Sequence, residues 1–584
     1  MTTSIDPIRM EVVRNALESI ADGMALTVVR TSRSSVVRTS LDFSTGVLDS
    51  KGELVGQSMC SPTHLGGMMP ALKSCLDQFE GRIYPGDILV TNDPYEGGSH
   101  LPDIFLFKPV WIGDRIVAYL CAMAHHTDIG GRVPGGNACD STEIYQEGLR
   151  IPPLKLQERG EPNETLMRIL EKAVRVPDKV LGDLKGQEAA LYYGEREYNK
   201  LVAQYGIEGL ESAVEELLDY TEELTRKSIS SMPDGTWTFT DVVDNDGFDD
   251  VPIKIVATVT KKGDEIEVDF EGTSPQCKGA IQPVFATTKA MVYAILRSVM
   301  EGEIPNTGGY FRPVSVYAPE GTFVNPLPPA PVAARALGCR RITHAILGAF
   351  AQMLPDRVFA CPGGSEVGVG VGGYDKSITP WKAWVQLEFH NETACGGRPT
   401  MDGTDGQGSN ISNLANIPAE TIEAEQPIQI LEYALIPDTE GAGKYRGGLG
   451  MVRTYRYLLD DTLVQVRADR EKTAPYGLHG GLSSTTTEVT VTKGGETKAM
   501  PTKFLDTLNS GDSLRIKWPG AGGWGDPLDR DPEAVLWDVV EDKVCAERAR
   551  DIYGVALDME HRAVDWDETR RMREKIIAGR REAS

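Results

Sequence analysis

A helix at the start of the chain is predicted by apolar residues that recur every four positions. These residues are Ile8, Val12, Ala16, Ile20, Met24 and Val28. Asp6 and Pro7 precede them, and an aspartate followed by a proline is typical of an N-cap and the first helical position. The spacing indicates an amphipathic helix of about six turns.

A β-hairpin is predicted over residues 104–126, where two apolar runs flank a turn at Gly113-Asp114. The second run is continuously apolar from Ile116 to Ala124. Such a run is typical of a strand that is buried on both faces. It ends at His125 and His126, so we expect it to deliver two imidazoles to one end of a sheet.

The remaining elements are predicted from shorter patterns of alternating or helically spaced apolar residues. In chain order they are a hairpin over 41–57, a helix near 67–79, a strand within 85–93, long helices over 161–230, strands over 237–273, helices near 284–301 and 331–354, strands over 428–518 and two charged helices over 533–581.

This mixture of elements predicts an α+β fold with several domains, mixed antiparallel β-sheets and long helical segments. A chain of 584 residues is also too long for one ordinary core. The predicted regions are an α+β region at 1–160, a helical segment at 161–232, a central α+β region with Gly-rich loops at 233–427, a β-rich region at 428–530 and a helical tail at 531–584.

Residues 359–425 are unusually rich in Gly, Asn, Asp and Thr. A stretch of this kind is either a solvated loop or a functional loop, and long polar loops are uncommon inside compact domains. We therefore expect this segment to line a pocket or an interface.

Composition excludes several classes of protein. The net charge is −25 and no block of Lys and Arg precedes the C-terminal tail, whereas a nucleic-acid-binding protein needs a basic surface. No apolar run approaches the roughly 20 residues of a membrane span, and the N-terminus has no signal-peptide pattern. The nine scattered cysteines include no CxxC pair, which argues against disulfides and thiolate zinc sites. We expect a cytoplasmic protein without nucleic-acid or membrane partners.

Two histidines and an aspartate form a candidate metal site. His100 and Asp103 share one turn, and His125 ends the second strand of the predicted hairpin. The hairpin turn places Asp103 opposite about residue 124, within reach of the same ion as His125. Neutral imidazoles and a carboxylate suit a borderline divalent cation, and Asp42 is a candidate fourth ligand. The alternative is two ordinary polar turns.

Two Gly-rich segments, 441–453 and 519–527, have weaker chemistry. Neither matches the phosphate-binding pattern Gly-x-x-x-x-Gly-Lys-Ser/Thr, which occurs nowhere in the chain. Structural turns are the favoured interpretation, and an anion-binding role for Arg446 is the alternative. The nucleophile pattern Gly-x-Ser-x-Gly is also absent.

The motifs in their order resemble the hydantoinase B/oxoprolinase family along nearly the whole chain. They are NDPYEGGSHLPDI, AHHTDIGG, EIYQEGLRIPPLKL, IPNTGGYFRP, GAGKYRGGLGMVRTYR, WPGAGGWGDPLDRDP and YGVALD. Ala521 is a departure, because the family usually has an unbroken run of glycines there. The family includes β-type subunits of ATP-dependent hydantoinases, oxoprolinases and lactamases, and subunits of acetone and acetophenone carboxylases are related to it.

The resemblance implies a divalent metal, zinc or manganese, whose ligands are His100, Asp103 and His125, with Asp42 as a less secure further ligand. It also implies a separate hydantoinase A-type subunit with an actin-like kinase fold, which binds ATP and Mg. We expect the two subunits to form an α2β2 or larger assembly.

We therefore predict the metal-containing subunit of an ATP-dependent cyclic amide hydrolase that opens a hydantoin, 5-oxoproline or lactam ring with its partner. The alternative is a subunit of an ATP-dependent ketone carboxylase, whose counterparts tend to be longer. A non-enzymatic scaffold and a non-haem iron site are further alternatives. Glu147, Asp128 and His126 are candidates for proton transfer or for support of the ligands, and a purely structural role is the alternative for each.

Overall fold

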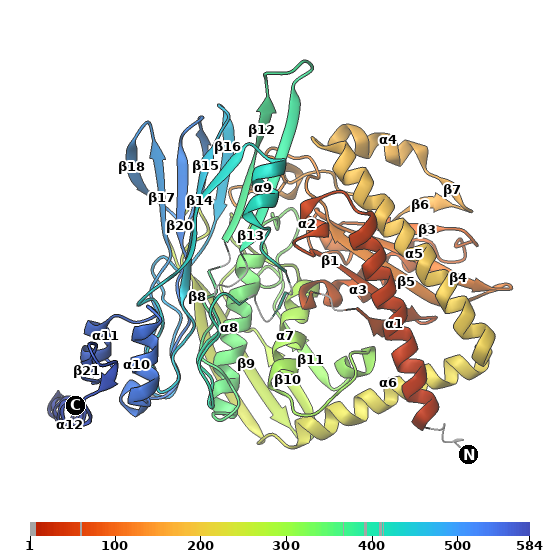
Figure 1. The fold of residues 1–584 in the computed structure, drawn as a ribbon. Helices are drawn as coiled ribbons and strands as arrows, with labels where there is room; N and C mark the ends of the chain where they lie inside the picture. The colour runs from red at the N-terminus through yellow and green to blue at the C-terminus, as the bar shows by residue number, and fades with distance from the viewer. Residues whose placement is uncertain are drawn as a thin grey trace.

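The computed structural model describes residues 7–58, 61–365, 367–390, 394–407, 411–412 and 414–583. Helices and several mostly antiparallel sheets alternate along the chain (Figure 1), and no sheet is closed within the described ranges. The predicted α+β, multi-domain fold class is confirmed. Asp6, the predicted N-cap of the first helix, lies outside the described residues.

The N-terminal sheet has seven strands in the order β2-β1-β5-β4-β3-β6-β7. The two predicted hairpins are confirmed as the antiparallel pairs β1–β2 and β4–β5. The strand bounds are β1 (Phe43–Asp49), β2 (Leu54–Gln57), β3 (Ile88–Thr91), β4 (Asp103–Ile112), β5 (Arg115–His125), β6 (Leu154–Glu158) and β7 (Glu161–Pro162).

Helices cover both faces of this sheet. Helices α1 (Pro7–Thr31) and α5 (Pro177–Tyr205) share a core with one face, which includes Ala122 and Ala124. Helix α3 (Pro62–Gln78) shares a core with the other face, which includes Cys121 and Met123. Strand β5 is therefore buried on both faces, as predicted. Because side chains alternate along a strand, its odd-numbered residues here face α3 and its even-numbered residues face α5.

A β-bulge corrects the predicted register of the β4–β5 hairpin by one residue. Next to the turn, Trp111 pairs with Ile116, but Val110 pairs with Ala118. Val117 is the extra residue, and an extra residue of this kind shifts every later pair along the ladder. As a result Asp103 pairs directly with His125, rather than with residue 124.

The helical segment predicted at 161–232 consists of α4 (Glu164–Ala173), α5 and α6 (Ile207–Ser230). Buried residues of all three helices belong to the same hydrophobic core as the N-terminal sheet. The predicted boundary near residue 160 therefore divides elements that share one core. That residues 1–160 and 161–232 are separate regions stays a prediction.

The central region is a four-stranded sheet, β11-β10-β9-β8, with two helices packed against it. Helix α7 (Phe285–Val299) also packs against α3, and α8 (Ala336–Met353) packs against β8 and β9. The strands are β8 (Gly235–Val243), β9 (Ile253–Lys262), β10 (Glu265–Asp269) and β11 (Val314–Tyr317).

Two further sheets share one core in the C-terminal half, in the orders β13-β12-β16-β19 and β14-β15-β20-β17-β18. The hairpin β12–β13 lies inside the segment predicted to be a loop, so that part of the prediction is wrong. The strands are β12 (Val367–Asp375), β13 (Lys382–His390), β14 (Ile428–Ile436), β15 (Gly450–Tyr457), β16 (Thr462–Arg467), β17 (Glu488–Lys493), β18 (Glu496–Met500), β19 (Lys503–Leu508) and β20 (Ser513–Lys517), and the short helix α9 (Ala419–Glu425) precedes β14.

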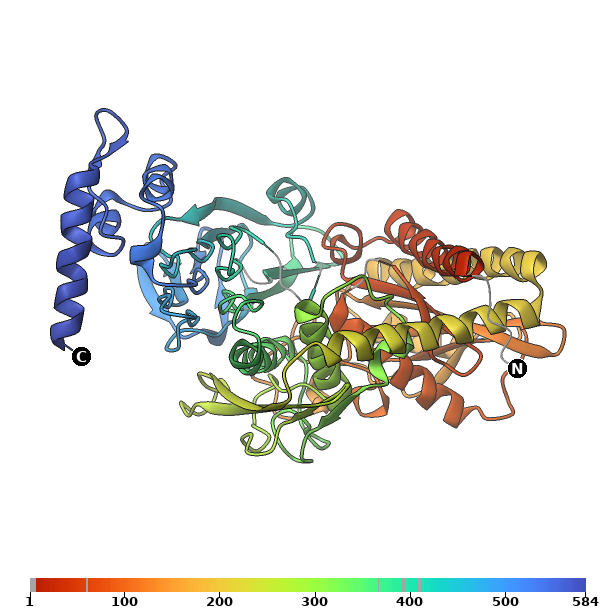
Figure 2. The same ribbon diagram turned by 90° about the horizontal axis from the view of Figure 1, so that it is seen from below.

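The C-terminal tail contains three helices instead of the two predicted. They are α10 (Pro532–Val540), α11 (Ala546–Asp551) and α12 (Trp566–Ala583), with the short strands β21 (Leu557–Asp558) and β22 (Ala563–Val564) between them. Helix α12 lies at the end of the molecule farthest from the N-terminal sheet (Figure 2). Among the described helices, none combines the length and apolar character needed to cross a membrane.

Candidate metal centre

The candidate ligands come from neighbouring strand ends on the α3 side of the N-terminal sheet. Asp103 starts β4 and is paired with His125, the last residue of β5. The backbone N–H of His125 also donates to the carbonyl of Asp42 at 3.0 Å, so Asp42 continues the same row across β1. His100 comes from the turn that leads into β4. The β4–β5 hairpin therefore brings Asp103 and His125 together, as predicted.

One ligand atom each from His100, Asp103 and His125 lies within 4.8 Å of the other two, and all three residues are buried. His100 Nδ1–H donates to the carbonyl of Ala333 at 2.8 Å, so its Nε2 carries the lone pair. That Nε2 lies 3.1 Å from Asp103 Oδ1. His100 Nε2, Asp103 Oδ1 and His125 Nδ1 have no hydrogen-bond partner among the described residues. Unpartnered buried polar atoms are costly, and two imidazoles with a carboxylate are a donor set that fits a divalent cation.

The second oxygen of Asp103 is held away from this cluster. Its Oδ2 accepts a hydrogen bond from the Ser99 hydroxyl and one from Arg335 Nη2 at 2.6 Å. Burial acts to raise the pKa of Asp103, but the neighbouring His100 and Arg335 outweigh it and hold the pKa well below its ordinary value. The carboxylate is therefore ionised and offers one oxygen to the cluster.

The two imidazoles are neutral, which is the form that binds a metal. Burial lowers the pKa of both His100 and His125 below the ordinary value. Asn137 lies beside His125, with Nδ2 3.4 Å from Nε2, and Asn137 Oδ1 has no described partner. Amide oxygen and nitrogen are interchangeable by a flip of the side chain. In the flipped orientation the amide oxygen would accept from His125 Nε2–H, and the Nδ1 lone pair would be left for the cluster.

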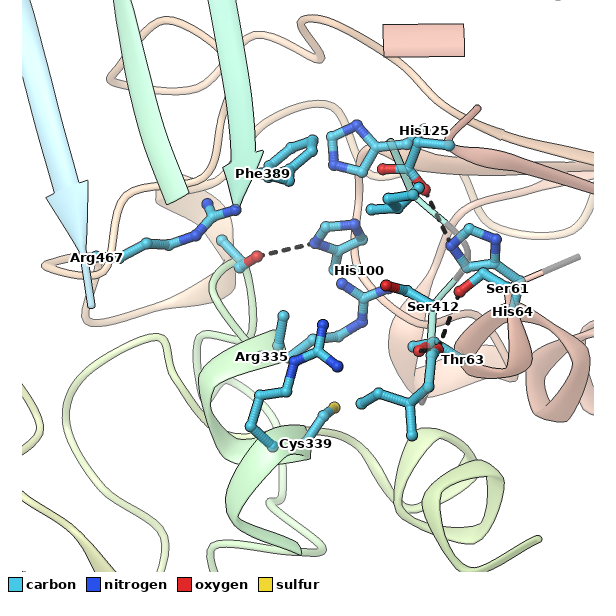
Figure 3. Close-up of a pocket in the computed structure, with 16 residues that line it drawn as sticks. Ser61, Thr63, His64, His100, His125, Arg335, Cys339, Phe389, Ser412 and Arg467 are labelled. Carbon is cyan, nitrogen blue, oxygen red and sulfur yellow. Dashed lines mark hydrogen bonds and ion pairs between the residues drawn. The ribbon is translucent and has the colours of Figure 1, made fainter. Parts of the chain in front are cut away.

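A cavity of about 50 Å³ opens beside these ligands, and Figure 3 shows His64, His100 and His125 around it. His64, which was not predicted, comes from the first turn of α3. Its Nδ1 is 3.0 Å from the Ser44 hydroxyl and its Nε2 is 3.3 Å from Asp42 Oδ1. Burial lowers the pKa of His64 to about 4, against the opposing charge of Asp103. Asp42, just before β1, and Ser44, on β1, both face α3, and this alternation is the sequence signal that leads to His64.

Asp42 lines the cavity, but it does not belong to the tight three-residue cluster. The predicted pocket-lining role of the segment 359–425 is confirmed in part, because Phe389, Ile411, Ser412 and Leu414 line the cavity. Arg335, Arg340 and Arg467 complete the wall, so cationic side chains surround the ligand cluster. Figure 3 places Arg467 and Phe389 on the same side of the cavity.

Glu147 does not line the cavity, but it supports the ligand cluster through the backbone of Val332 and Ala333. Its Oε1 accepts hydrogen bonds from the backbone N–H groups of Val332 at 2.8 Å and Ala333 at 2.9 Å. Ala333 in turn provides the carbonyl that orients His100. Burial raises the pKa of Glu147 to about 8, against the opposing effect of these hydrogen bonds. The geometry makes Glu147 a positioning residue.

Asp128 and His126 are also outside the cavity. Asp128 accepts from the backbone N–H groups of Gly135 at 2.9 Å and Arg175 at 2.6 Å. His126 faces the α5 side of the sheet, where Nε2 lies 3.0 Å from Gln187 Oε1. The bonds of Asp128 stabilise the Gly-rich loop after β5, and the contact of His126 stabilises the end of the strand. The structure therefore does not bring the two residues to the ligand cluster.

The two Gly-rich segments are tightly packed turns. A Cβ atom on Gly447 would lie 1.9 Å from the carbonyl oxygen of Ala521, so the two segments need glycine to touch. Arg446 is buried and pairs with Asp405 at 3.1 Å and Asp538 at 3.0 Å. Its charge is satisfied within the chain, which supports the structural interpretation.

Comparison with known proteins relates nearly the whole chain to one family. The family model for hydantoinase B/oxoprolinase matches residues 6–527. The B-type subunit of a putative D-/L-hydantoinase from Pseudomonas sp. (strain NS671) is 31% identical over 97% of this chain and 98% of its own length. The beta subunit of the caprolactamase from Pseudomonas jessenii is 32% identical over 95% of this chain and 97% of its own length.

Two solved structures have the same fold. The crystal structure of the ATP-dependent caprolactamase from Pseudomonas jessenii has a TM-score of 0.91 at 31% identity and covers 98% of this chain and 100% of that chain. A nucleotide-free acetone carboxylase structure also has a TM-score of 0.91, over 99% of this chain and 84% of that chain. Its identity is 18%, so that likeness is one of fold alone.

Proposed function

Because this chain belongs to the hydantoinase B/oxoprolinase family, we propose that it is the metal-containing subunit of an ATP-dependent cyclic amide hydrolase. The observation that carries the proposal is the convergence of three buried, unpartnered ligand atoms from His100, Asp103 and His125. The substrate is a hydantoin, 5-oxoproline or lactam ring.

His100, Asp103 and His125 would hold a divalent zinc or manganese ion, with Asp42 as a further candidate ligand. When bound, such an ion polarises a carbonyl group or lowers the pKa of a water molecule. Ala333 and Asn137 fix the orientation of the two imidazoles, and such supporting hydrogen bonds tune the affinity of a metal site. Ser99 and Arg335 occupy the second oxygen of Asp103, which leaves one oxygen for the ion.

ATP and Mg would bind to a separate hydantoinase A-type subunit in an α2β2 or larger assembly. Two observations support this division. The relatives are named as the B-type or beta subunits of their enzymes, and this chain contains no Gly-x-x-x-x-Gly-Lys-Ser/Thr pattern. A lactam carbonyl is a poor electrophile, so phosphorylation of its oxygen by ATP would supply a good leaving group.

A subunit of a ketone carboxylase is the second candidate, because an acetone carboxylase has the same fold. Identity is higher with the caprolactamase structure, at 31% against 18%, which favours the hydrolase. Purified complex should be assayed for ATP turnover with a lactam or hydantoin, and with a ketone plus bicarbonate. Turnover with the ketone alone would refute the hydrolase proposal.

Metal analysis tests the ligand assignment directly. We expect the wild-type chain to retain one equivalent of zinc or manganese after purification and the double variant His100→Ala/His125→Ala to lose it. The matched control is His479→Ala/His561→Ala, which removes two exposed imidazoles. Full occupancy in the first double variant would contradict the assignment, provided that its melting temperature shows it to be folded.

A further inference from the structure

A second, larger cavity of about 580 Å³ lies close to the metal centre. It is formed by α1, β2, α7 and the short helix η3 (Gly308–Phe311). Pro62 and Gly66 of α3 line this cavity, whereas Thr63 and His64 line the cavity of the metal centre. One turn of α3 therefore separates the two. Small-molecule sites usually have volumes of roughly 300–1,000 Å³, so this cavity has the size of a ligand site.

Two carboxylates stand on the α1 side of the larger cavity. Glu18 and Asp22 are one helical turn apart and both line it. Neither carboxylate forms a hydrogen bond or an ion pair with another residue in the described ranges. Arg14, the nearest cation along the helix, pairs with Glu11. Burial raises the pKa of Glu18, despite the opposing charge of Arg14. This wall therefore presents acidic groups without a basic partner of the chain itself.

A guanidinium stands on the α7 side. Arg297 lines the cavity and donates from Nη2 to the carbonyl of Ile304 at 3.0 Å. Within the part of the chain that the structure describes, no carboxylate lies within ion-pair distance of it. An arginine that is fixed by one backbone hydrogen bond keeps further N–H groups for a carboxylate ligand.

Aromatic rings also line the cavity. The ring centroids of Tyr293 and Phe311 are 4.3 Å apart, and those of Tyr310 and Phe311 are 5.5 Å apart. Thr307 also lines the cavity, and its buried hydroxyl has no partner among the described residues. The cavity thus combines an apolar wall with one cationic and one anionic side, a pattern suited to a short chain that carries opposite charges at its ends.

We propose that this cavity binds a zwitterionic ω-amino acid, with its carboxylate at Arg297, its ammonium at Glu18 and Asp22, and its methylene chain against the aromatic rings. This inference rests on the proposed function in one respect, which is the origin of the ligand. Hydrolysis of a lactam adds water across the C–N bond and yields one carboxylate and one ammonium group, so the ring-opened product has this chemistry.

The test is isothermal titration calorimetry, without ATP, of the full-length chain with 6-aminohexanoate, hexanoate and hexylamine. Two-ended recognition predicts that 6-aminohexanoate binds roughly tenfold or more tightly than either analogue, because each analogue lacks one charge-assisted contact. Arg297→Gln should weaken 6-aminohexanoate and hexanoate. Glu18→Gln/Asp22→Asn should weaken 6-aminohexanoate and hexylamine and leave hexanoate unchanged. Arg30→Gln, which removes an exposed cation of α1 that does not line the cavity, is the matched control and should alter none of the three.

Equal affinity for the three compounds, or no binding to the wild-type chain, would overturn the proposal. Ala294→Phe, which adds a ring inside the cavity, should abolish binding without loss of melting temperature, and undiminished binding to this variant would place the site elsewhere. Metal content is measured on the same preparations, and ATP-dependent hydrolysis of a lactam, a hydantoin and 5-oxoproline is measured after the hydantoinase A-type subunit has been added. Hydrolysis by the assembled enzyme without 6-aminohexanoate binding refutes this inference alone, whereas binding without hydrolysis of any of the three rings by the assembled enzyme refutes the proposed function.

Discussion

Replacement of Glu147 by glutamine separates a positioning role from a role in proton transfer. The carboxylate accepts two backbone N–H bonds through one oxygen, Oε1, and its other oxygen has no described partner. Glutamine keeps the shape and one acceptor oxygen for Val332 and Ala333, but it cannot titrate. We therefore expect Glu147→Gln to retain metal content and catalytic activity. Glu147→Leu removes the acceptor, leaves two buried N–H groups without a partner and releases Ala333, which orients His100.

The magnitude follows from burial of the carboxyl group. Its pKa is about 8 in the folded chain, against an ordinary value of 4.5. A folded-state pKa that is raised in this way contributes stability that is fully present below about pH 4.5 and is lost as the pH rises through about 8. At about 1.4 kcal/mol per pH unit, the loss reaches about 5 kcal/mol. Glu147→Gln should remove this loss, so its advantage over wild type grows with pH. Glu147→Leu should cost about 1–3 kcal/mol for each unpaired N–H group.

The assay is the melting temperature of wild type and both variants between pH 5 and pH 9, with metal content and the pH profile of the assembled enzyme measured in parallel. We expect the Glu147→Gln curve to rise above wild type toward pH 9, and only Glu147→Leu to lose metal. If Glu147→Gln keeps its metal but abolishes activity or removes one limb of the pH profile, Glu147 transfers protons and the positioning role is refuted.

Three further predictions concern the ligand cluster and its partner. Asn137→Leu should lower metal affinity by about 10–100-fold, since it removes the support of His125; an unchanged dissociation constant in a chelator competition would contradict the assigned orientation. Arg335→Met should raise the pKa of Asp103 and make metal retention more sensitive to acid, and a retention curve that does not move between pH 5 and pH 8 would contradict the pairing. The isolated chain should show no ATP-dependent ring opening until the hydantoinase A-type subunit is added, and steady turnover by the isolated chain would remove the need for that subunit.

The main parts of the N-terminal sheet were predictable because their patterns are local. The apolar run in β5 indicated burial on both faces, and the turn at Gly113-Asp114 brought Asp103 near His125. The bulge at Val117 was not predictable, because no turn residue or break in the apolar pattern marks it. His64 was missed for another reason. It reaches the cavity from a separate helix, and only the orientation of Asp42 and Ser44 toward that helix relates it to the site.

The hairpin β12–β13 was missed because its glycines suggested a loop. Val367, Val369 and Val371 alternate with glycine, which has the period of a strand, but glycine is generally depleted in strands. The structure explains the glycines. A Cβ atom on Gly368 would lie 2.2 Å from Arg467 Nε, so the strand leaves room for a side chain that crosses it toward the cavity. The glycines are needed for packing between strands that are distant in sequence. Local sequence patterns do not reveal such packing.

The bulge in β5 decides which of two neighbouring histidines joins Asp103. A regular ladder from the same turn would pair Asp103 with Ala124, and His126 would then face α3 while His125 faced α5. The deciding residue, Val117, lies eight positions from His125, or roughly 25 Å along an extended strand. Deletion of one residue near Val117 would remove the bulge itself. The regular ladder of the shortened strand would then keep His125 opposite Asp103. When related sequences differ in the length of this hairpin by one residue, the alignment gap therefore belongs at the bulge and not beside the histidines.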